Sequence, residues 1–165
     1  MACGHELGSH TYRHTSVITA TNQALIQEEE DNKAFFNSIL GDYHLSTFAY
    51  PFGDISPRTK RLYSKIFPLS RGIRRGLNGK WFDLAQVKAI PLEAREWDPA
   101  VIEDWVLKAK ATNAWLCLFT HDVSDNPTPW GATPEMLKHA LSTIRRCGIE
   151  IHTVKAAMAL TQFEE

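Results

Sequence analysis

The pattern of apolar and polar positions predicts a long helix near the start of the chain. Thr21 can cap a helix that runs to about Leu40, and Gly41 can end it. Apolar residues form one face near the end of this helix: Phe35, Phe36, Ile39 and Leu40. The acidic run at positions 28–31 is expected to be solvated, because four adjacent acids point all round a helix.

Short apolar runs and proline-marked helix starts alternate along the rest of the chain. Three helix starts have a capping residue followed by proline: Ser56-Pro57, Asp98-Pro99 and Thr133-Pro134. Short strands are predicted at residues 46–50, 67–73, 89–92, 114–120 and 149–154, the last as an edge strand. This alternation implies an α/β fold with a parallel sheet built from right-handed crossovers.

Length and composition limit the fold and the class of partner. The chain has 165 residues, 44% of them apolar, so residues 1–165 are expected to form a single domain. A net charge of −1 with both signs interspersed gives no reason to expect nucleic acid or an anionic membrane as partner. No run approaches the roughly 18 apolar residues of a membrane span. The start lacks the regions of a signal peptide, and three widely spaced cysteines suit a reducing compartment, so a cytoplasmic location is expected.

Two histidines four residues apart are the main candidate for chemistry. On one helical turn, this spacing points the imidazoles of His10 and His14 the same way. Two convergent neutral imidazoles can begin a zinc or similar divalent-metal site, which still needs a third ligand and an open position for water. The alternative is a polar helix start with two solvated or capping histidines.

Two further stretches could contribute to such a site. The turn at residues 50–53 contains Gly53, which lets the backbone approach a ligand closely. His121 and Asp122 follow the apolar run at 115–119, at the strand end where parallel α/β folds bind ligands. A histidine there can donate a proton near neutral pH. The alternatives are an ordinary turn packed on the core and a locally hydrogen-bonded His121.

Three motifs together resemble one family. His10-Thr11-Tyr12-Arg13-His14, preceded by Gly-His-Glu-Leu-Gly-Ser, resembles the metal-binding motif of the polysaccharide deacetylases, the NodB-homology group also called carbohydrate esterase family four. Phe48-Ala49-Tyr50-Pro51-Phe52-Gly53 resembles their substrate-groove motif, and Leu116-Cys117-Leu118-Phe119-Thr120-His121-Asp122 the strand that carries their catalytic histidine. The resemblance runs from residue 4 to about residue 160 and implies a deformed (β/α) barrel.

The resemblance also implies a reaction and a role for each motif. The reaction would be hydrolysis of N- or O-acetyl groups on a polysaccharide or amino sugar. His10 and His14 would hold a divalent ion, zinc first, with cobalt, nickel or manganese as alternatives. His121 would act as the general acid, and the Phe52 backbone N–H would help to hold the oxyanion. The substrate would be bound by Tyr50, Pro51, Phe52 and Gly53.

One departure from the family pattern is large. The family normally opens with a strand ending in Thr-x-Asp-Asp, whose first Asp is the general base and whose second is the third metal ligand. The sequence has no such motif before His10, so the expected barrel is truncated at its N-terminus. Deacetylase activity then requires a substitute carboxylate from Asp54, Asp122, Glu6 or a partner chain.

The departure leaves three possibilities open. The chain is a working deacetylase, a non-catalytic carbohydrate-binding or structural remnant, or a fragment of a longer deacetylase. A barrel without its first strands would also leave an open sheet edge and exposed apolar surface, so self-association is expected.

Overall fold

The computed structural model describes residues 4–161, which divide into two compact units. Unit 1 combines three stretches of the chain: Met1–Gly72, Asp83–Val87 and Thr153–Glu165. Unit 2 combines two stretches: Ile73–Phe82 and Lys88–His152. Each unit has an apolar core of its own. One domain over residues 1–165 stays a prediction.

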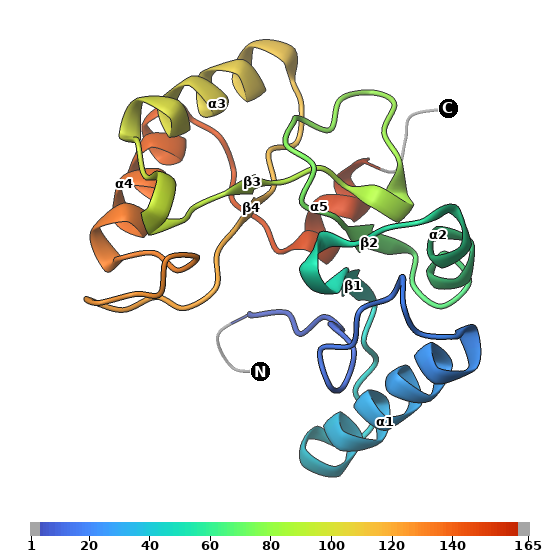
Figure 1. The fold of residues 1–165 in the computed structure, drawn as a ribbon. Helices are drawn as coiled ribbons and strands as arrows, with labels where there is room; N and C mark the ends of the chain where they lie inside the picture. The colour runs from blue at the N-terminus through green and yellow to red at the C-terminus, as the bar shows by residue number, and fades with distance from the viewer. Residues whose placement is uncertain (1–3, 162–165) are drawn as a thin grey trace. The chain divides into compact units, whose positions relative to one another are not determined.

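The described part of unit 1 contains helices and two short strands (Figure 1). The helices are α1 (Asn22–Leu40), α2 (Pro57–Tyr63), α5 (Val154–Thr161) and the single 3-10 turns η1 (Pro51–Gly53) and η2 (Leu84–Gln86). The strands are β1 (Thr47–Ala49) and β2 (Leu69–Arg71). The Thr21 side chain accepts a hydrogen bond from the Ala24 N–H, and Gly41 ends α1 at φ 76°. The predicted first helix is therefore confirmed at both ends.

β1 and β2 pair in parallel, and a single residue extends the pairing on each side. Ser9 bridges to Phe48 of β1, and Val87 bridges to Arg71 of β2. The Ser9 N–H donates to Thr47 O at 2.7 Å. The histidine-bearing segment therefore enters the structure as a sheet neighbour of β1.

Aromatic rings fill the core of unit 1. Phe48 stacks on Tyr63 with ring centroids 3.9 Å apart and an interplanar angle of 13°. Phe67 stacks on Phe48 at 5.4 Å, and Tyr50 meets Phe48 edge-on at 5.0 Å. These stacked and edge-to-face pairs join β1 to α2 and the segment after it.

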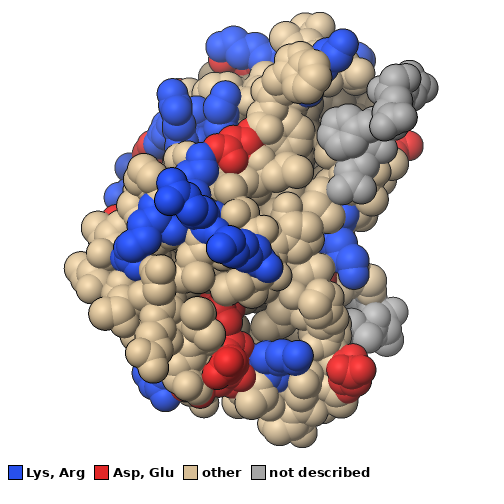
Figure 2. Space-filling view, turned by 90° about the vertical axis from the view of Figure 1, so that its right-hand side faces the viewer, with Lys and Arg blue, Asp and Glu red and all other residues tan. Residues whose placement is uncertain are grey.

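Basic side chains gather on the face that carries α2 (Figure 2). Two of the cations on α2 have structural partners. The Arg58 guanidinium donates to the carbonyls of Val17 and Ala20 at 2.8 and 2.9 Å, and Lys60 pairs with Asp83. Much of the charge on α2 therefore holds unit 1 together.

The described part of unit 2 places two long helices beside a second short strand pair (Figure 1). The strands are β3 (Ile90–Pro91) and β4 (Leu118–Phe119), and they run parallel. The helices are η3 (Ala94–Glu96), α3 (Pro99–Thr112) and α4 (Pro134–Arg146). The buried core residues come from these elements and the segments next to them: Ile90, Leu92, Ile102, Val106, Ala132, Met136, Ala140 and Ile144.

The three proline-marked helix starts are confirmed. α2, α3 and α4 each begin at the predicted proline, directly after the capping residue. The side-chain oxygens of the three caps accept main-chain N–H groups of the first turn: Ser56 from Thr59, Asp98 from Ala100 and Thr133 from Met136. Local sequence is enough to determine these ends, because the cap and the proline act within one turn.

Two expectations about exposure and strand formation are wrong. Residues 149–154 contain no strand; Glu150 instead pairs with His152 at 2.9 Å, and Val154 begins α5. Apolar-polar alternation does not make a strand where no neighbouring strand accepts its hydrogen bonds. In the acidic run, Glu28 and Glu29 are buried rather than solvated.

The mixed α/β class with parallel strands is confirmed. The two parallel pairs found in the described residues do not form a closed barrel, so the truncated deformed (β/α) barrel stays a prediction. None of the helices between residues 4 and 161 is both long enough and apolar enough to cross a bilayer.

Replacing Thr133 by Ala is expected to lower the free energy of unfolding by about 1 kcal/mol, because the N–H of Met136 loses its side-chain acceptor. Urea denaturation of wild type, Thr133→Ala and Thr133→Ser provides the measurement. The serine variant retains a hydroxyl and should stay close to wild type. Equal losses in both variants would count against capping as the cause.

Candidate functional site

His10 and His14 converge on a loop rather than on a helical turn. Their ring centroids lie 4.8 Å apart with an interplanar angle of 61°. The sequence-based expectation of a helix is wrong here, because Ser9 is held in the sheet and the chain then bends. Thr11 and His14 take φ values of 59° and 57°, in the left-handed region, which is a rare conformation for a β-branched residue such as Thr11.

Such strain persists only where the surroundings hold it, and it clusters at functional sites. The Thr11 Oγ1 atom is buried and accepts the Thr15 N–H at 2.8 Å, which closes the loop on itself. Gly8 lets the segment approach β1, since a Cβ there would lie 2.7 Å from Thr47 Oγ1. The convergence of His10 and His14 is therefore built by the loop.

A main-chain carbonyl orients the first histidine. His10 Nδ1 lies 2.6 Å from Ala49 O. A carbonyl can only accept, so this bond requires the proton on Nδ1 and presents Nε2 as the nitrogen that could bind a metal. In a zinc site with nitrogens about 2.0 Å from the ion, each ring centroid lies roughly 3 Å from it, and rings 4.8 Å apart can share one ion.

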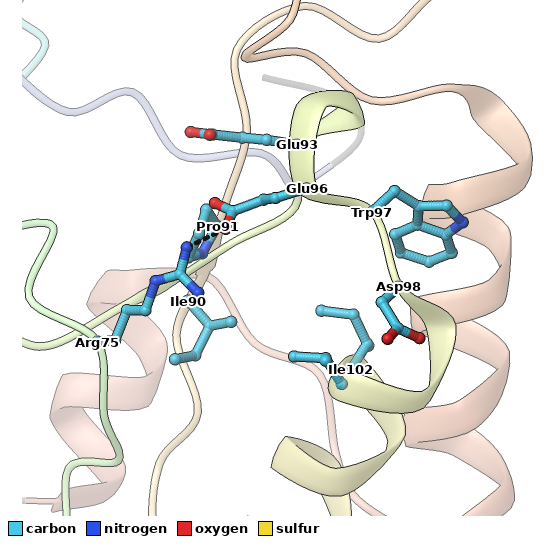
Figure 3. A pocket seen from close by; sticks show the side chains of 9 residues that line it. Arg75, Ile90, Pro91, Glu93, Glu96, Trp97, Asp98 and Ile102 are labelled. Atoms are coloured by element: carbon cyan, nitrogen blue, oxygen red, sulfur yellow. Dashed lines mark hydrogen bonds and ion pairs between the residues drawn. The ribbon is translucent and has the colours of Figure 1, made fainter.

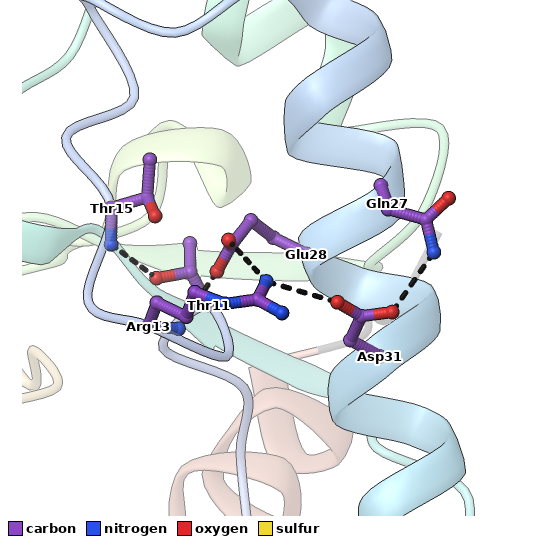
Figure 4. Close-up of polar contacts among 6 residues, drawn as sticks. All are labelled: Thr11, Arg13, Thr15, Gln27, Glu28 and Asp31. Atoms are coloured by element: carbon purple, nitrogen blue, oxygen red, sulfur yellow. Dashed lines mark hydrogen bonds and ion pairs between the residues drawn. The ribbon is translucent and has the colours of Figure 1, made fainter.

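Arg13 fastens the loop to α1 (Figure 4). Its main-chain N–H donates to Glu28 Oε2 at 2.7 Å, and its guanidinium donates to Glu28 Oε1 at 3.0 Å and Asp31 Oδ2 at 2.9 Å. Gln27 in turn donates to Asp31. Burial raises the pKa of Glu28, but the hydrogen bonds from Arg13 outweigh it, and the pKa lies below its usual value.

Glu29 lies under the loop in a buried polar cluster. Ser9 Oγ donates to Glu29 Oε2 at 2.5 Å, and Asn32 Nδ2 donates to Ser9 Oγ at 2.8 Å. Burial raises the pKa of Glu29 to about 7, against the opposing effect of the Ser9 hydrogen bond. The residue preceding His10 is thus held by α1 as well as by β1.

The turn after β1 places one exposed aromatic ring against the histidines. Phe52, at φ 59°, is 60% exposed, and its ring centroid lies 4.4 Å from that of His14. Gly53 follows at φ 71°. Tyr50 and Pro51 are buried, and the Tyr50 hydroxyl donates to Ala85 O at 3.1 Å. Of the four residues predicted to bind substrate, Phe52 and Gly53 are the accessible ones.

The candidate substitute carboxylates in unit 1 have structural partners. Glu6 Oε1 accepts the Thr47 hydroxyl at 2.5 Å and Oε2 accepts the Lys155 N–H at 2.7 Å, so Glu6 joins the N-terminal segment to α5. Asp54 Oδ2 accepts the Ser16 hydroxyl at 3.0 Å. Among residues 4–161, no three His, Cys, Asp or Glu side chains converge as a metal site requires. The histidine pair fits two positions of such a site and does not complete it.

His121 belongs to unit 2 and follows β4, as predicted. It is exposed, and its Nδ1 lies 3.2 Å from Trp130 O. As with His10, a carbonyl partner requires the proton on Nδ1 and leaves Nε2 for proton transfer. Asp122 is engaged next to it: hydrogen bonds from the Thr128 hydroxyl and N–H hold the pKa of Asp122 below its usual range.

A small pocket in unit 2 lies between β3 and the start of α3 (Figure 3). Its floor is apolar, with Ile90 and Ile102, and Arg75 pairs with Glu96 across it. Asp98 caps α3, Glu96 pairs with Arg75, and Glu93 pairs with Arg95. The polar side chains around this pocket therefore have partners within the fold.

A comparison with protein families bears on unit 1. The model of the polysaccharide deacetylase family matches residues 1–66. The family resemblance is confirmed for this stretch. No curated protein matches the chain. The deacetylase match includes His10, His14 and the turn at 50–53; His121 lies outside it.

Sequence reasoning missed the residues that hold the deacetylase motif in place. Ser9, Arg13 and the carboxylates of Glu28 and Glu29 form the contact between loop and helix. A signal for this was available, because Leu25, Glu28, Glu29 and Asn32 follow the i, i+3, i+4, i+7 spacing of one buried helix face. This buried face was missed because most of its residues are polar.

Replacing Glu29 by Gln is expected to remove a pH dependence of stability. The folded-state pKa of about 7 lies above the ordinary value of 4.5, so folding favours the protonated carboxyl. Its stabilising contribution is full below the ordinary pKa and is lost as the pH rises through the folded-state pKa. Between about pH 5 and pH 8, wild type should lose up to about 3 kcal/mol of unfolding free energy that Glu29→Gln retains.

Urea denaturation at both pH values provides the measurement, and Glu30→Gln is the matched control, because Glu30 is the exposed neighbour on the same helix. An unchanged pH dependence in Glu29→Gln would contradict the assignment.

Proposed function

We propose that this chain acts in the hydrolysis of acetyl groups, N- or O-linked, on a polysaccharide or amino sugar. One observation carries the proposal: His10 and His14 converge at 4.8 Å, with His10 oriented by Ala49 O, inside the stretch that matches the deacetylase family. Convergent imidazoles held by a strained loop are the arrangement a catalytic metal site needs.

In this proposal, His10 and His14 hold a divalent ion, zinc first, with cobalt, nickel or manganese as alternatives. Such an ion lowers the pKa of a bound water and polarises the acetyl carbonyl when it is present. The accessible turn at Phe52 and Gly53 receives the sugar. His121 of unit 2 is kept as the proposed general acid. For this role both of its ring nitrogens must carry a proton, so that Nε2 can give one to a leaving nitrogen or oxygen as the bond to the acetyl carbon breaks and acetate is released.

The third ligand and the general base are proposed to come from outside the described residues, either from further residues of a longer polypeptide or from a partner chain. The engagement of Glu6 and Asp54 in unit 1 supports this, because each would have to leave a structural hydrogen bond to reach a metal.

The same observation favours a second candidate function. A histidine pair without a converging carboxylate among residues 4–161 suits a carbohydrate-binding protein that does not hydrolyse its ligand. Metal affinity separates the two candidates, since only the hydrolase needs a tightly held ion.

Titration of Zn²⁺ and Co²⁺ into the purified protein is expected to show one site that depends on both histidines, with an affinity limited by the lack of a third converging ligand among residues 4–161. Replacing either His10 or His14 by Ala should weaken this binding by about tenfold or more, because each removes a direct ligand. His44→Ala is the matched control, since His44 is exposed and lies in the same unit. Release of acetate from acetylated sugar oligomers is followed in the same samples.

Metal binding that is lost in both variants, together with acetate release, would support the hydrolase. Metal binding that is absent from wild type, or unchanged in His10→Ala and His14→Ala, would overturn the hydrolase proposal. In that case, binding of acetylated oligosaccharide by the metal-free protein would support the second candidate.

A further inference from the structure

We propose that the indole of Trp130 is a stacking platform for a pyranose ring of the substrate, next to His121. The inference rests on the proposed function for the role of His121 and names the sugar-binding residue beside it. Trp130 is 49% exposed, and its main-chain oxygen lies 3.2 Å from His121 Nδ1. An exposed aromatic face suits the apolar face of a sugar ring.

The backbone around Trp130 is held from two sides. The Arg95 N–H donates to Pro129 O at 3.0 Å, and the Ala94 N–H donates to Gly131 O at 2.7 Å. On the other side, the His121 N–H donates to Trp130 O at 3.3 Å. The residue that presents the indole is therefore fixed to η3 and to the segment after β4.

The loop leading to Trp130 is braced from within. Asp122 accepts the Thr128 N–H at 2.9 Å and the Thr128 hydroxyl at 2.5 Å, and Asp122 O accepts the Ala132 N–H at 2.9 Å. Gly131 permits this packing, because a Cβ there would lie 2.4 Å from Asp122 Oδ1. A rigid loop presents a large side chain without the entropy cost of ordering it on binding.

A buried carboxylate positions the group that packs on the indole. The Arg95 guanidinium lies over the Trp130 ring, 5.5 Å from its centroid, and its Nε donates to Glu93 at 2.7 Å. The Glu93 side chain is almost fully buried. Arg95 therefore supports the indole in one orientation while half of the indole surface remains open.

Trp97 and Trp81 do not have this arrangement. Trp97 packs edge-on against His139 at 5.6 Å and joins the core of unit 2. Trp81 is 87% exposed, with Lys80 6.0 Å from its ring centroid. Trp130 combines exposure, a braced backbone and direct contact with His121.

Isothermal titration of the full chain with soluble oligomers of N-acetylglucosamine and of acetylated xylose tests the platform. Trp130→Ala is expected to weaken binding about five- to tenfold, and Trp130→Phe should retain most of the affinity, because a phenyl ring can still stack. The contact with His121 is made by the main chain, so neither substitution removes it. Trp81→Ala is the matched control and should bind like wild type; thermal unfolding verifies that all variants fold.

Four results would overturn the platform. They are wild-type affinity in Trp130→Ala, equal losses in the Ala and Phe variants, an equal loss in Trp81→Ala, and no binding of either oligomer by wild type. Acetate release in the same samples distinguishes the two proposals. Oligomer binding that depends on Trp130, with no acetate release, would support the platform and count against the deacetylase. Acetate release that is unchanged in Trp130→Ala would support the deacetylase and count against the platform.

Discussion

The docking of the histidine-bearing loop on α1 is the contact on which the candidate site depends. Two buried carboxylates make it: Glu28 accepts both the main chain and the guanidinium of Arg13, and Glu29 accepts the hydroxyl of Ser9. Buried carboxylates require partners, and the loop supplies them to both oxygens of Glu28 and to Oε2 of Glu29. Together with the local bond from the Thr15 N–H to Thr11 Oγ1, these contacts hold Thr11 and His14 at positive φ.

This contact also explains the unusual pattern of α1. Its buried face carries two glutamates and an asparagine, while apolar side chains near its end are exposed, Ile39 by 62%. An ordinary amphipathic helix would have the reverse arrangement. Phe35 is partly covered by Tyr12, at a ring distance of 5.9 Å, so the loop shields the start of this apolar end and leaves Ile39 open.

Sequence predicts those features whose causes lie within one turn of the chain. The caps at Ser56, Asp98 and Thr133, and the end of α1 at Gly41, follow from a side chain or a φ value at that position. The approach of His10 to His14 was anticipated, but its helical origin was wrong. The position of the loop depends on hydrogen bonds between residues that are distant in sequence, such as Glu6 and Lys155. A local sequence pattern does not predict such partners.

Two of the three histidines assigned chemical roles, His10 and His121, are oriented in the same way. His10 Nδ1 meets Ala49 O, and His121 Nδ1 meets Trp130 O, so in both residues a main-chain carbonyl determines which nitrogen can react. A main-chain carbonyl does not titrate. It also remains when the side chain of the same residue is replaced. Replacing the side chain of Ala49 or Trp130 would therefore leave both carbonyl contacts, and the Nδ1 proton that they require, in place. If His121 is the proton donor and Trp130 the sugar platform, as proposed, changes to the indole would alter sugar binding and leave the carbonyl contact of His121 in place.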